Sequence, residues 1–285
     1  MKVLRRRRPI WSSAARAFTL VELLVVIAIL GVLAALILAA LSSAKRTVRQ
    51  THCINNVRQL GSALLQFVAD HQVYPLLVNS RSRDSSDPYF GFGQSWKTAL
   101  QTILSPGYPK ERSVDGVPLF IMQDEGVWRC PTAQRPPELP NKIGYTSYGY
   151  NPWGLYTPFD NDNAPLGLGG QNYPWTDPMT IVPMEPVREA QVAAPSDMMA
   201  IGDKFAGNNG VVTDTGGLVR QQGIKEDYPG STKHAYSRHE GKADVVFCDG
   251  HVESPSFKTL FDDDSDAALR RWNRDHQPHR DRLGL

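Results

Sequence analysis

The side chains best suited to chemistry lie near the C-terminal end of the chain. His239 is followed by Asp249, Gly250 and His251, and His234 lies shortly before it. Imidazole and carboxylate groups bind divalent transition ions, so His239, Asp249 and His251 are candidate metal ligands. The alternative is structural, because an Asp in a tight turn bonds local backbone amides and a His can dock on a carbonyl or carboxylate. The residue types favour the structural role over the metal site.

Familiar catalytic motifs are missing from the sequence. It contains no Gly-x-Ser-x-Gly elbow, no His-Glu-x-x-His, no glycine-rich phosphate loop and no Cys-x-x-Cys. Calcium in an irregular loop is a candidate at Asp160–Asn163, although the glycine and the bidentate Glu of an EF-hand are lacking. We therefore expect a protein that is not an enzyme and that needs no cofactor.

An uncharged apolar stretch near the N-terminus follows a single carboxylate. Leu23–Leu41 has no charged residue, and Glu22 stands immediately before it. A helix of this length measures about 28 Å, close to the hydrocarbon thickness of a bilayer. A charge in the apolar layer costs up to about 3 kcal/mol, so Glu22 is expected to have a partner. The alternative is that this acid snorkels to the cytoplasmic headgroups.

The charges around this stretch predict its orientation. The bases before it, which include Arg5–Arg8, belong on the cytoplasmic side, so the N-terminus is expected inside and the remaining chain outside. The formal charge of +2 becomes negative once these bases are set aside, so no nucleic-acid partner is expected. A cleaved signal peptide is the alternative, but the run is longer than a secretory core and no small-x-small site clearly ends it.

The residues AFTLVELLVVIAILGVLAAL, from Ala17 to Leu36, resemble the N-terminal segment of type IV prepilins and of type II secretion pseudopilins. This resemblance implies that a prepilin peptidase cuts between Ala17 and Phe18, methylates the new Phe18 amine and leaves the apolar helix on the mature subunit. Glu22 would then meet the Phe18 amine of a neighbouring subunit during assembly. The family favours Gly where this chain has Ala17. Its implied partners are the peptidase, other pilin-like subunits and a secretion or pilus assembly platform.

A second resemblance concerns the C-terminal part of the chain. The spacing of His239 to Asp249-Gly250 is similar to a motif of prepilin-like proteins abundant in planctomycetes and verrucomicrobia. Other matching segments are Cys53–Leu60, Cys130-Pro131, Thr146–Asn151, and Pro195–Asp197 leading to Gly202-Asp203. This motif labels the group but carries no reaction with it.

Apolar residues recur at three- and four-residue spacing from Val48 to Val68, which predicts that the helix continues to about residue 70, before Pro75. Its apolar stripe needs a sheet to cover it. We predict an α+β, pilin-like fold in which a long N-terminal transmembrane and amphipathic helix packs on a small antiparallel β-sheet with long ordered loops. The expected domains are a basic leader (1–17), a transmembrane helix (18–41) and a periplasmic domain (42–285), with a loop-rich β region (75–260) and a short C-terminal helix (about 264–275).

Several local elements can be placed within the soluble part. Asp249-Gly250 predicts a hairpin turn with both residues at positive φ, between strands near 243–248 and 251–253. Residues 95–104 are expected to be helical. Val127–Cys130 is expected to be a strand.

Three cysteines in an exported domain predict one disulfide and one remaining thiol. Sequence separation and chemical setting favour Cys53 with Cys130, and Cys248 is expected to be a small buried apolar residue. The aromatic residues Trp96, Trp128, Trp153 and Trp175, with the tyrosines of 145–156, form either a carbohydrate-binding surface or a core.

The sequence therefore predicts a prepilin-like structural subunit of the bacterial inner membrane. It is expected to cross the membrane once, with its C-terminal domain in the periplasm, and to assemble into a type II secretion pseudopilus or a type IV pilus-like fibre. The alternatives are a membrane-anchored periplasmic protein that binds carbohydrate and a metal-dependent periplasmic enzyme.

Overall fold

The computed structural model describes residues 19–76, 95–107, 110–114, 117–121, 126–133, 147–156, 165–169, 185–203, 220–221, 238–261 and 263–285. The chain divides into two units, Met1–Thr47 and Val48–Leu285. The helices are α1 (Leu20–His71), α2 (Trp96–Leu104), α4 (Phe257–Phe261) and α5 (Asp266–Leu269), and the 3-10 helices are η1 (Gly126–Trp128), η2 (Glu189–Gln191), η3 (Arg238–Glu240), η4 (Arg270–Trp272) and η5 (Arg280–Leu283). The strands are β1 (Lys110–Val114), β2 (Val117–Ile121), β3 (Tyr148–Tyr150), β4 (Leu155–Tyr156), β5 (Met199–Asp203), β6 (Arg220–Gln221), β7 (Val245–Phe247) and β8 (Val252–Glu253).

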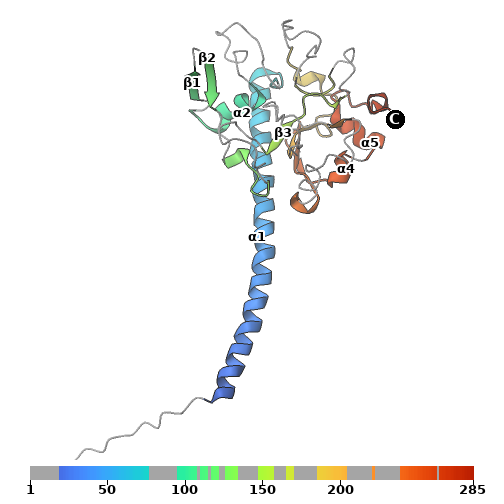
Figure 1. Cartoon of the computed structure of the whole chain (residues 1–285). Coiled ribbons are helices and arrows are strands. Elements are labelled where there is room, and N and C mark those ends of the chain that lie inside the picture. Colours follow the sequence, from blue (N-terminus) through green and yellow to red (C-terminus); the bar gives the residue numbers. More distant parts are fainter. Residues whose placement is uncertain are drawn as a thin grey trace, which may run out of the picture. The chain divides into compact units, whose positions relative to one another are not determined.

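The longest element is α1, a single helix of 52 residues (Figure 1). Its first half is apolar on all sides, and its second half is amphipathic, as the spacing predicts. The buried side chains of the second half recur every three or four residues and include Cys53, Val57, Leu60 and Leu64. The helix ends where Gln72 adopts a left-handed φ of 60° and donates its N–H to the Val68 carbonyl at 2.7 Å.

A four-stranded antiparallel sheet in the order β3-β5-β7-β8 covers the buried stripe of α1. The register pairs Tyr150 with Ile201 and Val246 with Val252, and β5 is irregular between Met199 and Ile201. The long helix and this sheet confirm the predicted α+β, pilin-like fold. Two small pairs, β1-β2 and the parallel β4-β6, lie outside this sheet.

Both faces of the sheet are buried. Successive residues of β7 point to opposite sides of the sheet, and each side packs against a different apolar cluster. Val246 packs in one apolar cluster with Leu60 and Leu64 of α1. Phe247 packs in a second cluster with Leu269 of α5 and Trp272 of η4. The sequence predicted the helix on the first face but not the C-terminal segment on the second.

Two glycines allow α1 to approach the hairpin of β7 and β8 closely. A Cβ on Gly61 of α1 would lie 2.5 Å from Cγ2 of Val246, and a Cβ on Gly250 would lie 2.5 Å from Cδ1 of Leu65. Gly250 also has a φ of 89°, which disfavours any other residue. Helix and hairpin therefore meet closely at two positions. At Gly61 the neighbour is the short Val246 side chain, and at Gly250 it is the end of the Leu65 side chain, which can shift more readily.

Two local expectations are wrong. Residues 126–128 form the 3-10 helix η1 rather than a strand over Val127–Cys130, because Gly126 takes a left-handed φ of 64° and its carbonyl accepts the Arg129 N–H at 3.2 Å, a local turn bond. The hairpin has positive φ at Gly250 but not at Asp249, since a three-residue loop follows Phe247: the Gly250 N–H donates to the Phe247 carbonyl at 2.9 Å and the Phe247 N–H to the His251 carbonyl at 3.0 Å. The strands are accordingly shorter than expected.

The aromatic residues that we considered for a carbohydrate-binding surface lie in the core wherever the structure describes them fully. Trp96 stacks on Tyr150 with ring centroids 5.5 Å apart and meets Trp128 edge-on at 5.8 Å. Trp96, Trp128, Tyr148 and Tyr150 are all buried, and Trp153 is half-buried. Trp175 lies outside the described residues, as do Asp160–Asn163, the run considered for calcium.

Candidate functional sites in the N-terminal segment and around His239

The N-terminus of α1 is closed by a reciprocal pair of polar side chains, Thr19 and Glu22. The Glu22 carboxylate accepts hydrogen bonds from the Thr19 N–H at 2.9 Å and from the Thr19 hydroxyl at 2.8 Å. The Glu22 N–H donates to the Thr19 hydroxyl oxygen at 3.2 Å. This arrangement is a capping box, which satisfies amides that a helix end leaves unpaired. The carboxylate also lies where the helix dipole favours negative charge.

Glu22 thus has a local partner within its own chain. Its expected contact with the Phe18 amine of a neighbouring subunit stays a prediction. Ala17 and Phe18, between which the cut is expected, lie outside the described residues.

The apolar half of α1 displays its side chains. Large hydrophobic residues from Leu20 to Leu41 are between 45% and 77% exposed. Among the described residues, α1 is the one helix long and apolar enough to cross a membrane, a test that a signal sequence near the N-terminus would also pass. Exposed apolar area of this extent is unfavourable in water, so lipid or other apolar helices must cover it.

The prokaryotic N-terminal methylation motif matches residues 12–38, a stretch that includes Ala17, Phe18, Glu22 and most of the apolar half of α1. This motif, together with the long helix that begins within it, is consistent with a type IV prepilin-like protein and confirms the resemblance seen in the sequence. The protein is therefore membrane-anchored, and the motif implies processing by a prepilin peptidase and assembly with other pilin-like subunits. No curated protein and no solved structure gave a match.

The second site surrounds His239, and its backbone is unusual. His239 has a φ of 48°, and the next two residues, Glu240 and Gly241, have φ values of 59° and 82°. Residues other than glycine adopt such angles at a cost of about 1–2 kcal/mol each. This turn directs the His239 ring into the interior, where its side chain is 0% exposed. His234, which precedes this turn, lies outside the described residues.

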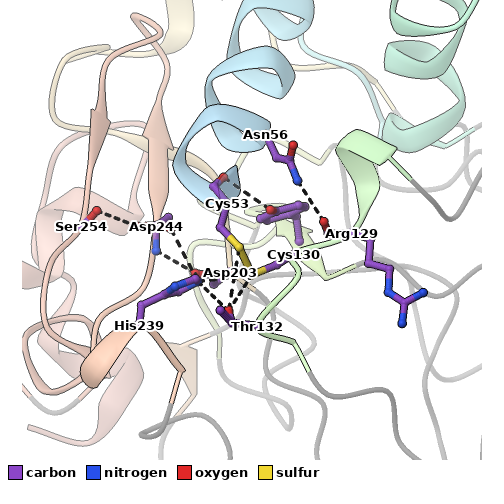
Figure 2. Close-up of a disulfide and its surroundings, with 10 residues drawn as sticks. Cys53, Asn56, Arg129, Cys130, Thr132, Asp203, His239, Asp244 and Ser254 are labelled. Carbon is purple, nitrogen blue, oxygen red and sulfur yellow. Dashed lines mark hydrogen bonds and ion pairs between the residues drawn. A yellow bond between two sulfur atoms is a disulfide. The ribbon is translucent and has the colours of Figure 1, made fainter. Parts of the chain in front are cut away.

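Polar atoms from three segments converge on the His239 Nε2 atom (Figure 2). Asp203, at the end of β5, places Oδ2 at 3.3 Å, and Asp244, just before β7, places Oδ2 at 3.6 Å. Cys130 Sγ and Thr132 Oγ1 each lie at 3.4 Å. The Asp203 and Asp244 side chains are both 0% exposed. A single imidazole is thus the centre of a fully buried acidic cluster.

Hydrogen bonds hold the two carboxylates in place. The Asp244 N–H donates to Asp203 Oδ2 at 2.8 Å, and the Asp203 N–H donates to the Asp244 carbonyl at 3.0 Å. Ser254, after β8, donates its hydroxyl to Asp244 Oδ1 at 2.6 Å. The cluster therefore joins β5, β7 and the chain that follows β8.

The disulfide beside this cluster joins Cys53 of α1 to Cys130, the pair favoured by the sequence (Figure 2). Both cysteines are completely buried. A polar contact holds the same two segments together, since the Asn56 side-chain amide donates to the Arg129 carbonyl at 2.9 Å. The Tyr148 hydroxyl of β3 donates to the Cys53 carbonyl at 3.4 Å. The helix is thereby fixed to the segment that follows η1.

Asp249 and His251 occupy a different environment from His239. His251 Nδ1 lies 2.6 Å from Asp249 Oδ1, its Nε2 lies 3.3 Å from Glu253 Oε1, and its ring stacks on Phe247 at 4.4 Å. The side chains of Asp249 and His251 are more than a third exposed. Burial raises the pKa of Asp249, but hydrogen bonds from the His251 backbone and side chain outweigh it, so the pKa is lowered overall.

The structure therefore does not bring together the three metal candidates His239, Asp249 and His251. Asp249 is used by the turn, where its Oδ1 accepts the His251 N–H at 3.1 Å. In the described part of the chain, the potential ligand groups with atoms within 4.8 Å of one another are Asp203, His239 and Asp244, and Cys53, Cys130 and His239. Asp244 was not predicted from the sequence as a site residue, and Asp203 stood out only within a segment that resembles the prepilin-like group.

Proposed function

We propose that this protein is a structural subunit that polymerises through its N-terminal helix into a pilus-like fibre, either a type II secretion pseudopilus or a type IV pilus. The observation that carries this proposal is the exposed apolar half of α1, most of which lies within the methylation motif. Packing between helices of neighbouring subunits would replace the lipid that covers these side chains before assembly. The chain itself performs no catalytic step in this proposal.

The proposed topology places the N-terminus in the cytoplasm and the domain from Val48 onward in the periplasm, with one membrane crossing. The basic residues before the apolar stretch support this orientation. The buried disulfide supports export, because disulfides persist in oxidising compartments such as the periplasm. The proposed partners are the prepilin peptidase, other pilin-like subunits and the assembly platform in the inner membrane.

Glu22 has two roles in this proposal. Before assembly, its carboxylate caps α1 through Thr19. During assembly, it neutralises the methylated Phe18 amine of a neighbouring subunit and so sets the axial stagger between helices. A charge pair in an apolar surrounding is stronger than in water, which makes the second role specific for a charged side chain.

Mass spectrometry of the mature N-terminus tests the processing step. The chain is co-expressed with its peptidase, and the mature product is expected to begin at methylated Phe18. An intact leader, or a cut near Ala40 or Ala44, would contradict the proposal because either would point to a plain anchor or to signal peptidase.

Three variants separate the charge of Glu22 from its capping role. Glu22→Gln retains a capping acceptor but loses the charge, because Gln serves in a capping box as Glu does. Thr19→Val keeps the charge and removes the hydroxyl, which weakens the cap by about 1 kcal/mol. Glu22→Ala loses both. Crosslinked ladders in cells are compared per mature subunit, with the processed fraction measured for each variant.

If charge pairing drives assembly, Glu22→Gln is as defective as Glu22→Ala, and Thr19→Val assembles almost normally. If Glu22→Gln forms the wild-type ladder and Thr19→Val does not, Glu22 acts as a cap only and the proposed pairing is refuted. Ladders that are equal in all three variants would also refute it.

A further inference from the structure

We propose that Asp203, His239 and Asp244 form a buried site for one divalent transition-metal ion of the Zn²⁺ type. The site lies beside the Cys53–Cys130 disulfide and uses the N/O ligand set while that disulfide is intact. Its role would be structural, because it would join β5, the turn that carries His239, and the start of β7.

Hydrogen bonding alone does not account for the atoms around His239. Nε2 carries at most one hydrogen, yet four polar atoms lie 3.3–3.6 Å away, contributed by Asp203, Asp244, Thr132 and Cys130. All of these separations exceed the usual N–H···O distance of about 2.9–3.0 Å. His239 Nδ1 has no hydrogen-bond partner among the described residues, so Nε2 is the atom through which the ring is anchored.

The separations do match the edges of a tetrahedral metal site. Ligand bonds of about 2.0–2.2 Å, as for N and carboxylate O on zinc, place neighbouring ligand atoms about 3.3–3.6 Å apart. The His239 Nε2 atom lies 3.3 Å from Asp203 Oδ2 and 3.6 Å from Asp244 Oδ2. The ligand atoms of all three residues lie within 4.8 Å of one another, so a small movement of the carboxylates would close the site.

The charge of the cluster also favours a cation. Asp203 and Asp244 are both 0% exposed, and buried carboxylates require compensation by an opposite charge. A divalent ion bound beside a neutral His239 would place two positive charges against the two carboxylates. The bonds from the Asp244 N–H and from the Ser254 hydroxyl orient the carboxylates, as outer hydrogen bonds do in metal sites.

The ligand types select the kind of ion. Imidazole with two carboxylates suits Zn²⁺ and related transition ions, whereas Ca²⁺ takes six to eight oxygen ligands. Thr132 Oγ1 or a water molecule would complete four-coordination. Cys130 Sγ is as close as Thr132, but a sulfur in a disulfide is not a thiolate and does not ligate. The competing set of Cys53, Cys130 and His239 would require reduction.

The test uses the untagged full chain in detergent, with an intact disulfide verified by mass, stripped of metal by a chelator. After addition of Zn²⁺ and desalting, we expect one equivalent of zinc per chain and a higher unfolding temperature, and Ca²⁺ should give neither. Asp244→Asn and His239→Gln should lose the bound zinc and the shift. His251→Gln is the matched control, because it removes an exposed imidazole that also lies between two carboxylates, and it should retain both.

Co²⁺ substitution of the wild type keeps the test decisive if the variants fail to fold. We expect the absorption of tetrahedral Co²⁺ without thiolate charge-transfer bands. No retained metal in the oxidised wild type would overturn the site. So would retention by Asp244→Asn, binding only after reduction, or strong thiolate bands, which would point to Cys53 and Cys130 instead.

Discussion

Replacement of Gly61 tests how closely α1 packs on the sheet. A Cβ at this position would lie 2.5 Å from Cγ2 of Val246, which is fully buried in β7. Because Val has few alternative rotamers, the helix or the strand must shift. Overpacking of this kind costs about 1–3 kcal/mol, and the better helix propensity of Ala offsets about 1 kcal/mol. We expect Gly61→Ala to lower the free energy of unfolding by up to about 2 kcal/mol.

The helix offers a matched control in Gly31, where an added Cβ would meet nothing within 4 Å. Gly31→Ala should therefore leave the stability of the folded domain unchanged. Both variants are measured by urea unfolding of the full chain in mild detergent. Near-UV circular dichroism is the probe, because it reports on the buried tryptophans Trp96, Trp128 and Trp272.

A double-mutant cycle with Val246→Ala identifies the clash directly. Val246→Ala alone should destabilise, because it leaves a cavity in the core. In the double variant the added methyl group occupies that space. The destabilisation of the double variant should therefore be smaller than the sum of the two single destabilisations, by about 1 kcal/mol or more. If the two costs simply add, the close packing of α1 on β7 is refuted.

Three further predictions concern the same domain. Cys53→Ala with Cys130→Ala opens a loop of 77 residues and should cost about 4 kcal/mol in urea unfolding, and an unchanged midpoint would argue against the bridge. Burial raises the pKa of the Cys248 thiol to about 12, so alkylation at pH 8 should require unfolding, and labelling of the native protein would contradict this. Burial raises the pKa of Glu253, but the hydrogen bond and charge of Arg271 outweigh it and lower the pKa overall. This pair therefore stabilises the fold above the ordinary carboxyl pKa of 4.5, and the stability is lost as the pH falls through the lowered value. The loss of stability in Arg271→Gln should shrink in acid, and a pH-independent difference would refute the pairing.

Local patterns were enough to predict the parts of the fold that depend on neighbouring residues. The spacing from Val48 to Val68 predicts the amphipathic half of α1, and the structure buries most of that stripe from Cys53 onward, whereas Val48 is exposed. The Asp249-Gly250 pair locates the hairpin, although the three-residue loop shifts its strand ends. Both features depend only on residues that are close together in the sequence, so the spacing of apolar residues and the type of turn residue are enough to predict them.

The His239 cluster could not be predicted in the same way. Asp203 and Asp244 are 41 residues apart, and they meet because β5 pairs with β7 in one particular register. Their positions at the end of one strand and just before another show no spacing that would connect them to His239. Long-range register decides such sites, and one sequence does not display it.

The two ends of the His239 to Gly250 motif are connected to α1 at separate points, one through the disulfide and one directly. His239 contacts Cys130, which is bonded to Cys53 of α1, and Gly250 lies against Leu65 of α1. Cys53 and Leu65 are about 18 Å apart along a helix. The motif therefore holds about three turns of α1 against the sheet. The helix cannot rotate or slide within the domain without breaking one of the two connections.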